Sequence, residues 1–270
     1  MAISARALVT DNPLTPALRV FEYCATSYRR VWRGSLFSTF LSPVLFLAAM
    51  GLGLGTFVDQ SSGGALGGIS YAAWLAPGLL AGQAMQTAGF ESTWPIMGAI
   101  IWDRTYWAML NTPVTVPGIV LGQLGWIACR LALAATAFFV VMVAFGLVAS
   151  PLGVLAIPVA VLTGLAFAAP ICAFSATQRN DQGFNALFRF GLTPMFLFSG
   201  TFFPIERLPA PLQLVAEILP LHHGVALARH LCLGDEADRS DQLAHLVVLL
   251  VYVIGGVVAC LVTFRRTLVK

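Results

Sequence analysis

The sequence is short of charge and has almost no lysine. Asp, Glu, Lys and Arg together make up 10% of its 270 residues, and Lys270 is the only lysine. A soluble domain usually carries about a quarter charged residues, so this shortage excludes an ordinary soluble globule. The formal net charge of +3 gives no reason to expect nucleic acid as a partner.

The shortage of lysine also limits enzymatic function. A phosphate-binding loop of the form GxxxxGK[ST] needs a lysine inside the chain to reach the nucleotide phosphates. The residues before Lys270, "FRRTLV", do not form such a loop. We therefore predict that this chain does not hydrolyse ATP by that route. If its work is driven by ATP, the nucleotide sites lie on another polypeptide.

Clustered cysteine and other reactive side chains are also missing. The adjacent His222 and His223 point different ways on a helix, so we favour interfacial packing there over a metal site. Serines, histidines and acids form no nucleophile-and-base set, and we predict no catalytic, metal or cofactor site in this chain. The cysteines are far apart without a CxxC pair, a pattern typical of packing residues: Cys24, Cys129, Cys172, Cys232 and Cys260.

Long apolar runs are what the sequence has in abundance. Hydrophobic residues make up 58% of the chain and occur in blocks of about 20, the length of a helix that crosses a bilayer core. Backbone polar groups in lipid must be bonded within the segment, and the runs lack the alternation of barrel strands. We predict an all-α, polytopic membrane protein with six spans, at about 36–57, 71–90, 116–148, 152–176, 183–203 and 243–264.

The distribution of basic residues predicts the orientation of these spans. Cytoplasmic loops carry an excess of Lys and Arg. With the N-terminus inside, the outer side holds only Arg207, Arg229 and Arg239. Both termini are therefore expected in the cytoplasm. The inner side then holds Arg6, Arg19, Arg29, Arg30, Arg33, Arg104, Arg179, Arg189, Arg265, Arg266 and Lys270.

The rest of the chain is organised around the spans. We assign residues 1–35 to a cytoplasmic N-terminal segment, 36–265 to the transmembrane domain and 266–270 to a cytoplasmic tail. Residues 14–34 mix apolar residues with arginines, which suits an amphipathic helix on the inner membrane surface; a cytosolic tail without membrane contact is the alternative. Residues 204–241 contain several prolines and charges, so we expect short re-entrant or interfacial helices on the outer side.

The stretch "DRTYWAMLNTPVTVPG" at 103–118 interrupts the apolar runs on the cytoplasmic side. It predicts a short exposed helix over about 102–111, which ends before the first proline. Tyr106, Trp107 and Leu110 would form one aromatic face on this helix, suited to a partner's groove. The alternative is an aromatic belt that lies on the lipid headgroups.

Side chains inside the spans suggest a substrate path. If the third span begins at Val116, Arg130 lies about 20 Å along it and could line a path or bind an anionic headgroup. If it begins at Trp126, Arg130 extends to the inner interface instead, the interpretation that we favour. The aromatic residues of the fifth span could line an apolar part of the path or be ordinary helix packing: Phe196, Phe198 and Phe202.

Glycine pairs spaced by four residues lie in or beside the spans. This spacing lets two helices approach closely. Because glycine is common in membrane helices, each pair alone is weak evidence for a dimer interface. The pairs are Gly51 and Gly55, Gly78 and Gly82, and Gly118 and Gly122.

Four motifs together resemble a known family. They are "FESTW" (90–94), "YWAMLNTPVTVPGIVLGQLGW" (106–126), "FLFSGTFFPIERLPAPLQ" (196–213) and "LPLHHGVALARHLCLG" (219–234). In combination they are similar to the ABC-2-type permeases, among them the nodulation lipo-oligosaccharide exporter permeases and, more distantly, the daunorubicin-type drug exporter permeases. The resemblance covers the chain from about Leu36 onward. It does not extend to the residues before Arg29.

The resemblance implies an architecture and partners. The fold would be that of a type V exporter-like permease in the bacterial inner membrane. It would work as a homodimer, or with a related permease, in contact with membrane lipid. Two copies of a cytoplasmic ATPase would hold ATP and Mg. The residues that couple to the ATPase would be Glu91, Trp102, Asp103, Arg104, Tyr106, Trp107 and Leu110.

We therefore expect the translocation subunit of an ATP-driven exporter for an amphipathic molecule, such as a lipid-linked oligosaccharide, glycolipid or hydrophobic natural product. Two alternatives stay open. An ion-coupled secondary transporter would need acidic or polar residues at mid-membrane, and a membrane-embedded transferase would need acids or histidines clustered at one interface. Neither alternative explains the aromatic inner helix.

Overall fold

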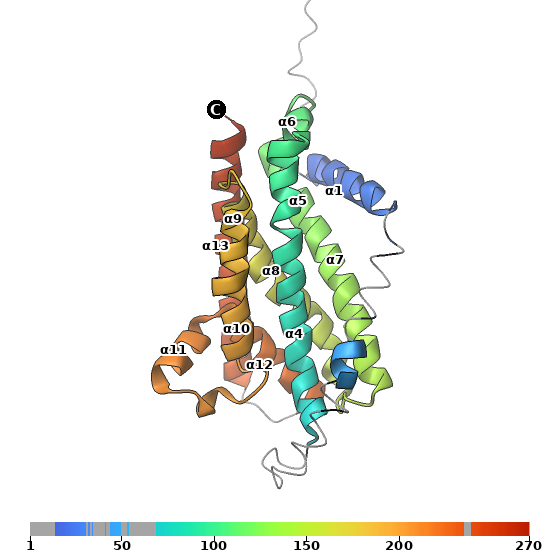
Figure 1. Cartoon of the computed structure of the whole chain (residues 1–270). Helices are drawn as coiled ribbons and strands as arrows, with labels where there is room; N and C mark the ends of the chain where they lie inside the picture. The colour runs from blue at the N-terminus through green and yellow to red at the C-terminus, as the bar shows by residue number, and fades with distance from the viewer. Residues whose placement is uncertain are drawn as a thin grey trace, which may run out of the picture.

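The computed structural model describes residues 14–30, 69–234 and 239–269, together with a few positions between 32 and 53. Most of the predicted first span, 36–57, lies outside the described residues. Within the described part the regular elements are all helical and the long helices run roughly side by side (Figure 1). The all-α prediction is therefore confirmed.

Three helical stretches in the described part are long and apolar enough to cross a membrane. They are α7, Val116–Ala144, the stretch Pro151–Ser175, and Ser240–Leu268 within α13. The second begins as a 3-10 turn, η4 (Pro151–Leu155), and continues as α8 (Ala156–Ser175). The third belongs to the longer α13 (Arg239–Leu268). The number of spans and the side on which each terminus lies stay predictions.

Helix α4, Tyr71–Glu91, matches the predicted second span in position. Its N-terminus is capped by Ser70, whose Oγ accepts a hydrogen bond from the N–H of Ala73 at 3.3 Å. An N-cap of this kind satisfies one of the free donors at the start of a helix. Helix α4 contains small residues and Gln among its apolar residues, and it is not among the stretches that qualify as spans by length and composition.

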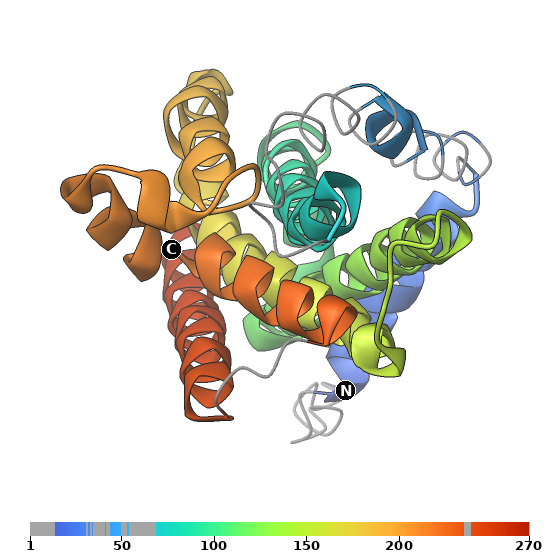
Figure 2. The same ribbon diagram turned by 90° about the horizontal axis from the view of Figure 1, so that it is seen from below.

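Helix α8 is at the centre of the packing. It contacts α4, α7, α12 (Pro220–Leu233) and α13. Seen from the end in Figure 2, α4 and α7 lie to the right, α13 lies to the left and α12 crosses the centre. Gly256 allows the close approach of α13 to α8, because a Cβ at that position would lie 2.6 Å from Cδ of Pro170.

At the predicted fifth span, 183–203, residues 182–198 form one unbroken run of helical turns with a π-helical stretch in the middle. It consists of α9 (Gln182–Ala186), the π-helical η5 (Leu187–Leu192) and α10 (Thr193–Phe198). Proline has no N–H and clashes with the preceding turn, and Pro194 lies where the wide π turn ends. The helix stops at Phe198, before the turn at Gly200 with φ 85°. The expectation of a helix through 203 is therefore wrong.

The segment predicted to lie on the outer side is a series of short helices. These are η6 (Ile205–Arg207), α11 (Ala210–Ile218) and α12. Helix α12 ends at Gly234 with φ 78°, a backbone conformation in which glycine is favoured. The depth of this segment in the membrane stays a prediction.

Helix α1, Leu14–Tyr28, lies against α7 at the end of the molecule that also carries α6 and the C-terminus (Figure 1). The glycine pair of α7 makes this contact possible. A Cβ at Gly118 would lie 2.6 Å from Cβ of Pro16, and one at Gly122 would lie 2.7 Å from Cβ of Val20. This spacing, considered above for a dimer, here serves packing within one chain.

Candidate functional site

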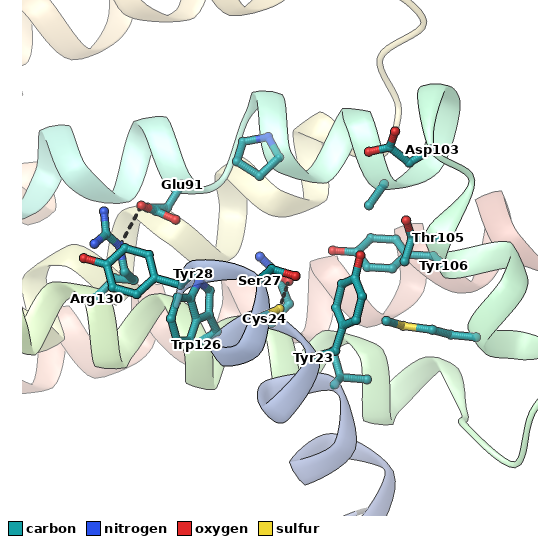
Figure 3. Close-up of a pocket in the computed structure, with 15 residues that line it drawn as sticks. Tyr23, Cys24, Ser27, Tyr28, Glu91, Asp103, Thr105, Tyr106, Trp126 and Arg130 are labelled. Atoms are coloured by element: carbon teal, nitrogen blue, oxygen red, sulfur yellow. Dashed lines mark hydrogen bonds and ion pairs between the residues drawn. The ribbon is translucent and has the colours of Figure 1, made fainter. Parts of the chain in front are cut away.

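A cavity of about 410 Å³ lies between α1, the end of α4, the segment that follows α4, and α7 (Figure 3). Helix α1 forms one wall with Tyr23, Cys24, Ser27 and Tyr28. The opposite walls come from two chain segments that sequence alone does not place together. They contribute Glu91, Pro95, Ala99, Asp103, Thr105, Tyr106 and Met109, and from α7 Gln123, Trp126 and Arg130.

An ion pair closes one end of this cavity, which is called the inner pocket below because α1 and α6 are predicted to lie on the cytoplasmic side. The Nε of Arg130 on α7 donates to Oε1 of Glu91, the last residue of α4, at 2.9 Å. The side chains are 17% and 20% exposed respectively, so the pair is mostly shielded from solvent. The guanidinium also lies 4.5 Å from the ring centre of Tyr28, a cation–π contact. Arg130 thus joins α7 to both α4 and α1.

This geometry refines both sequence interpretations of Arg130. Its guanidinium lines the pocket and pairs with Glu91 (Figure 3); whether this place belongs to a substrate path or to the inner interface stays a prediction. A charge inside a membrane protein usually faces protein or water. The resemblance placed Glu91 at the root of the coupling helix, but only the structure pairs it with Arg130.

Aromatic rings and a buried thiol form the wall contributed by α1 and α7. The Trp126 ring packs edge-on against Phe21 at 5.8 Å and Tyr28 at 5.5 Å. The Sγ of Cys24 donates to Oε1 of Gln123 at 3.4 Å. Burial, and then the negative charge of Glu91, raises the pKa of Cys24 to about 11. Cys24 therefore stays a thiol near neutral pH, and this excludes a ready nucleophile at that position.

The helix predicted over 102–111 begins later than expected. A π-helical turn, η3 (Gly98–Trp102), comes first, and α6 spans Thr105–Leu110. Between them Arg104 has φ 53°, a left-handed conformation that interrupts a right-handed helix. Asp103 therefore precedes the break and does not lie in the first turn of the helix.

The expected single aromatic face of this segment is not formed. Tyr106 is only 3% exposed and packs against Phe264 of α13, with ring centres 5.9 Å apart. Trp107 is 38% exposed and donates from Nε1 to the carbonyl of Ile100 at 3.1 Å. Trp102 is 62% exposed. The accessible aromatic surface is thus Trp102 and Trp107, because helix periodicity places Tyr106 toward the core.

A second hollow lies on this exposed side. It has a volume of about 560 Å³ and is lined by Ile100, Ile101, Arg104 and Trp107. The side chains of Asp103 and Arg104 are exposed beside it, whereas Leu110 is half-buried. The exposed surface of the segment therefore combines an apolar hollow with charge.

The three phenylalanines considered for a substrate path do not converge. Phe196 and Phe202 pack edge-on with ring centres 5.1 Å apart, and the Phe196 ring lies directly on Gly82 of α4. Phe198 is 39% exposed and apart from that pair. The structure therefore brings together two of the three residues, at the end of the bundle opposite the inner pocket.

Sequence reasoning missed most of the residues that line the pocket. The spacing of the aromatic residues of α1 and of Trp126 indicates that they lie on helices. No feature of either segment, however, indicates that these two helices pack against each other. Among the described residues there is no group of three His, Cys, Asp or Glu side chains placed to hold a metal ion.

Comparisons with known proteins extend the family likeness to residues before Arg29, so the expectation that it stops there is wrong. A family model described as "ABC-2 type transporter" matches residues 20–233. Nodulation protein J of Rhizobium leguminosarum bv. viciae is 32% identical over 253 residues, covering 94% of this chain and 95% of the relative. The bv. trifolii protein of the same name is 33% identical over 244 residues, 90% of each chain. That of Rhizobium meliloti (strain 1021) is 35% identical over 209 residues, 77% of this chain and 78% of the relative.

Proposed function

Because the chain belongs to the ABC-2 type transporter family and is a multi-pass bacterial membrane protein, we propose that it is the permease subunit of an ATP-driven exporter. Two copies of the permease work with two copies of a separate cytoplasmic ATPase. Each permease spans the membrane six times with both termini inside. ATP and Mg bind to the ATPase.

The observation that carries this proposal is the place of the inner pocket. One wall is α1 and the other continues directly into η3 and α6, the segment with exposed Trp102 and Trp107. A partner that moves this segment necessarily moves Asp103, Thr105 and Tyr106, and so reshapes the pocket. Nucleotide-driven motion would reach the cargo site through that short connection.

The chemistry of the pocket supports an amphipathic cargo. Hydroxyl, amide and charged groups line it alongside aromatic rings, a combination suited to a polar head. Helix α1 exposes Leu14 and Leu18, which are 61% and 62% accessible, so its outer side suits the inner leaflet. A cargo would place its apolar part in lipid and its head in the pocket, in keeping with a glycolipid or lipid-linked oligosaccharide.

The test is retention of the ATPase by the tagged permease after co-expression with the ATPase encoded beside it. We expect Trp102→Ala/Trp107→Ala to lose most of the bound ATPase, because the exposed aromatic groups of the docking segment are removed. Phe145→Ala, which truncates a 41% exposed aromatic residue at the other end of α7, is the matched control and should retain it.

Two results would count against the proposal. If the wild-type permease retains no ATPase in several mild detergents, the partner is wrong. If ATPase is absent and cargo efflux in vesicles follows an ion gradient without ATP, the chain is a secondary transporter.

A further inference from the structure

All four histidines of the sequence lie where α12 meets α13. Helix α12 is at the end of the bundle opposite α6 (Figure 1). Nδ1 of His223 on α12 lies 2.7 Å from Nδ1 of His245 on α13. Their ring centres are 4.9 Å apart, and His222 lies 5.4 Å from the first ring and 5.7 Å from the second. Three imidazoles from two helices thus form one cluster.

The central contact of this cluster depends on protonation. A hydrogen bond between two imidazole nitrogens requires one to donate its N–H and the other to keep its lone pair. With one proton added, an imidazolium can still donate to a neutral imidazole. When both rings are protonated, both Nδ1 atoms are donors, and the 2.7 Å contact faces two N–H groups and two like charges toward one another.

Burial strengthens this dependence. His223 is 9% exposed, and its Nε2 is buried without a hydrogen-bond partner in the described part of the chain. Burial, followed by the neighbouring His222 and His245, lowers the pKa of His223 from 6.5 to about 4, against a smaller opposite effect of Glu217. The packed structure therefore favours the neutral imidazole at pH 7.

Among the described residues, two acids act on the cluster. Asp241 on α13 acts on His245, and Glu217 at the end of α11 acts on His223. Two hydroxyl groups from other elements also lie against α12. Thr163 of α8 lies near Gly224, and Ser150, the residue before η4, lies near Gly234. Neither hydroxyl titrates at neutral or acidic pH.

The neighbouring histidine contact along the same two helices is built differently. Nε2 of His230 on α12 lies 2.7 Å from Nε2 of Gln242 on α13. An amide can rotate and present either its nitrogen or its oxygen, so this contact does not require one protonation state. It supplies an internal control within the same helix interface.

Helix α12 also connects this cluster to the rest of the outer end. Arg229 donates from Nη2 to the carbonyl of Gly200 at 2.9 Å and from Nε to that of Trp74 at 3.2 Å. Its guanidinium lies 3.8 Å from the ring centre of Trp74 on α4. A movement of α12 away from α13 would therefore carry the turn at Gly200 and the start of α4.

We propose that His223 and His245, with His222 beside them, form a proton-sensitive latch between α12 and α13. The latch is closed while at least one ring of the pair is neutral, and it opens when both are protonated. Only its placement on the outer face, where it would make cargo release respond to external acidity, rests on the proposed function and topology.

The test is amide hydrogen exchange of the purified permease in lipid nanodiscs between pH 7.5 and 3.5. No ATPase or cargo is present, so a negative result would not touch the proposed function. The labelling times are adjusted for the intrinsic rate of amide exchange, which changes with pH. A chelator is present to remove trace metal. In the wild type we expect residues 220–233 to lose protection in acid by about tenfold, the factor that corresponds to one pKa unit of coupling.

Two variants distinguish the latch from general acid unfolding. His223→Asn offers polar atoms at about the position of Nδ1 without titrating and should keep 220–233 protected at pH 3.5. His245→Arg mimics one protonated ring, because arginine is a permanent cation and donor; 220–233 should stay protected at pH 7.5 and lose protection in acid when His223 alone takes up a proton. His230→Gln, which leaves the pair intact, should behave as the wild type. The latch is overturned if the wild type shows no selective loss at 220–233, or if His223→Asn loses protection equally.

Discussion

The two ends of the bundle hold their helices together with different chemistry. At the inner end a carboxylate and a guanidinium pair across the wall of an open pocket, where Glu91 and Arg130 meet at 2.9 Å. At the outer end two imidazoles, those of His223 and His245, meet at 2.7 Å in a packed contact. The inner contact is an attraction between opposite charges in a site shielded from water. The imidazole contact instead requires that one of the two Nδ1 atoms carries no proton. The inner end is therefore suited to transmit a movement and the outer end to sense its surroundings.

The largest expected effect comes from breaking the inner pair. Glu91→Ala leaves the Arg130 guanidinium mostly shielded without its carboxylate, and losing one partner of a buried pair costs about 3 kcal/mol. We expect a clear fall in the thermal unfolding temperature in detergent and loss of ATP-driven cargo efflux from cells.

The exchanged variant Glu91→Arg/Arg130→Glu sharpens this test. It should recover part of the stability if pairing is what matters. If Glu91→Ala melts like the wild type and the exchanged variant shows no gain in stability, the ion pair does not hold the helices of the inner end together.

An intermediate effect is expected where α1 packs on α7. Gly122→Ala adds a Cβ that would lie 2.7 Å from Cβ of Val20, and overpacking of this kind costs about 1–3 kcal/mol. We expect α1 to detach, with faster amide exchange over residues 14–28. Gly125→Ala is the control, because its nearest neighbour would be Cδ2 of Phe21 at 3.9 Å. Equal protection of α1 in both variants would show that this inner contact tolerates displacement.

The smallest effect concerns the backbone break before α6. Arg104 has φ 53°, and a glycine adopts this conformation without the steric cost of a side chain. We expect Arg104→Gly to stabilise the inner end by about 0.5 kcal/mol at most, since glycine also loses more freedom on folding. Slower exchange over residues 105–110 is the measurement. Arg104→Val, with a branched side chain, should have the opposite sign; the same sign for both would argue against strain at this residue.

Local sequence signals located the long helices well and their partners poorly. The start predicted at 71 coincides with that of α4, and α7 begins at 116, the earlier of the two starts considered, because composition and cap residues act within one helix. The end predicted at 203 was wrong because the helix stops at Phe198, before the turn at Gly200. The aromatic face of 102–111 failed because Tyr106 turns toward Phe264, a residue far along the chain.

The sequence by itself determined the class of this protein: apolar runs of membrane length and scarce charge leave helices in lipid as the stable solution. Its motifs, matched by family relatives, determined the kind of transporter. Only the tertiary structure decided that Glu91 meets Arg130, that α1 closes a pocket over α7, and that His223 meets His245. Helix formation depends on neighbours within a few residues, whereas these contacts join residues from separate helices and are selected by packing.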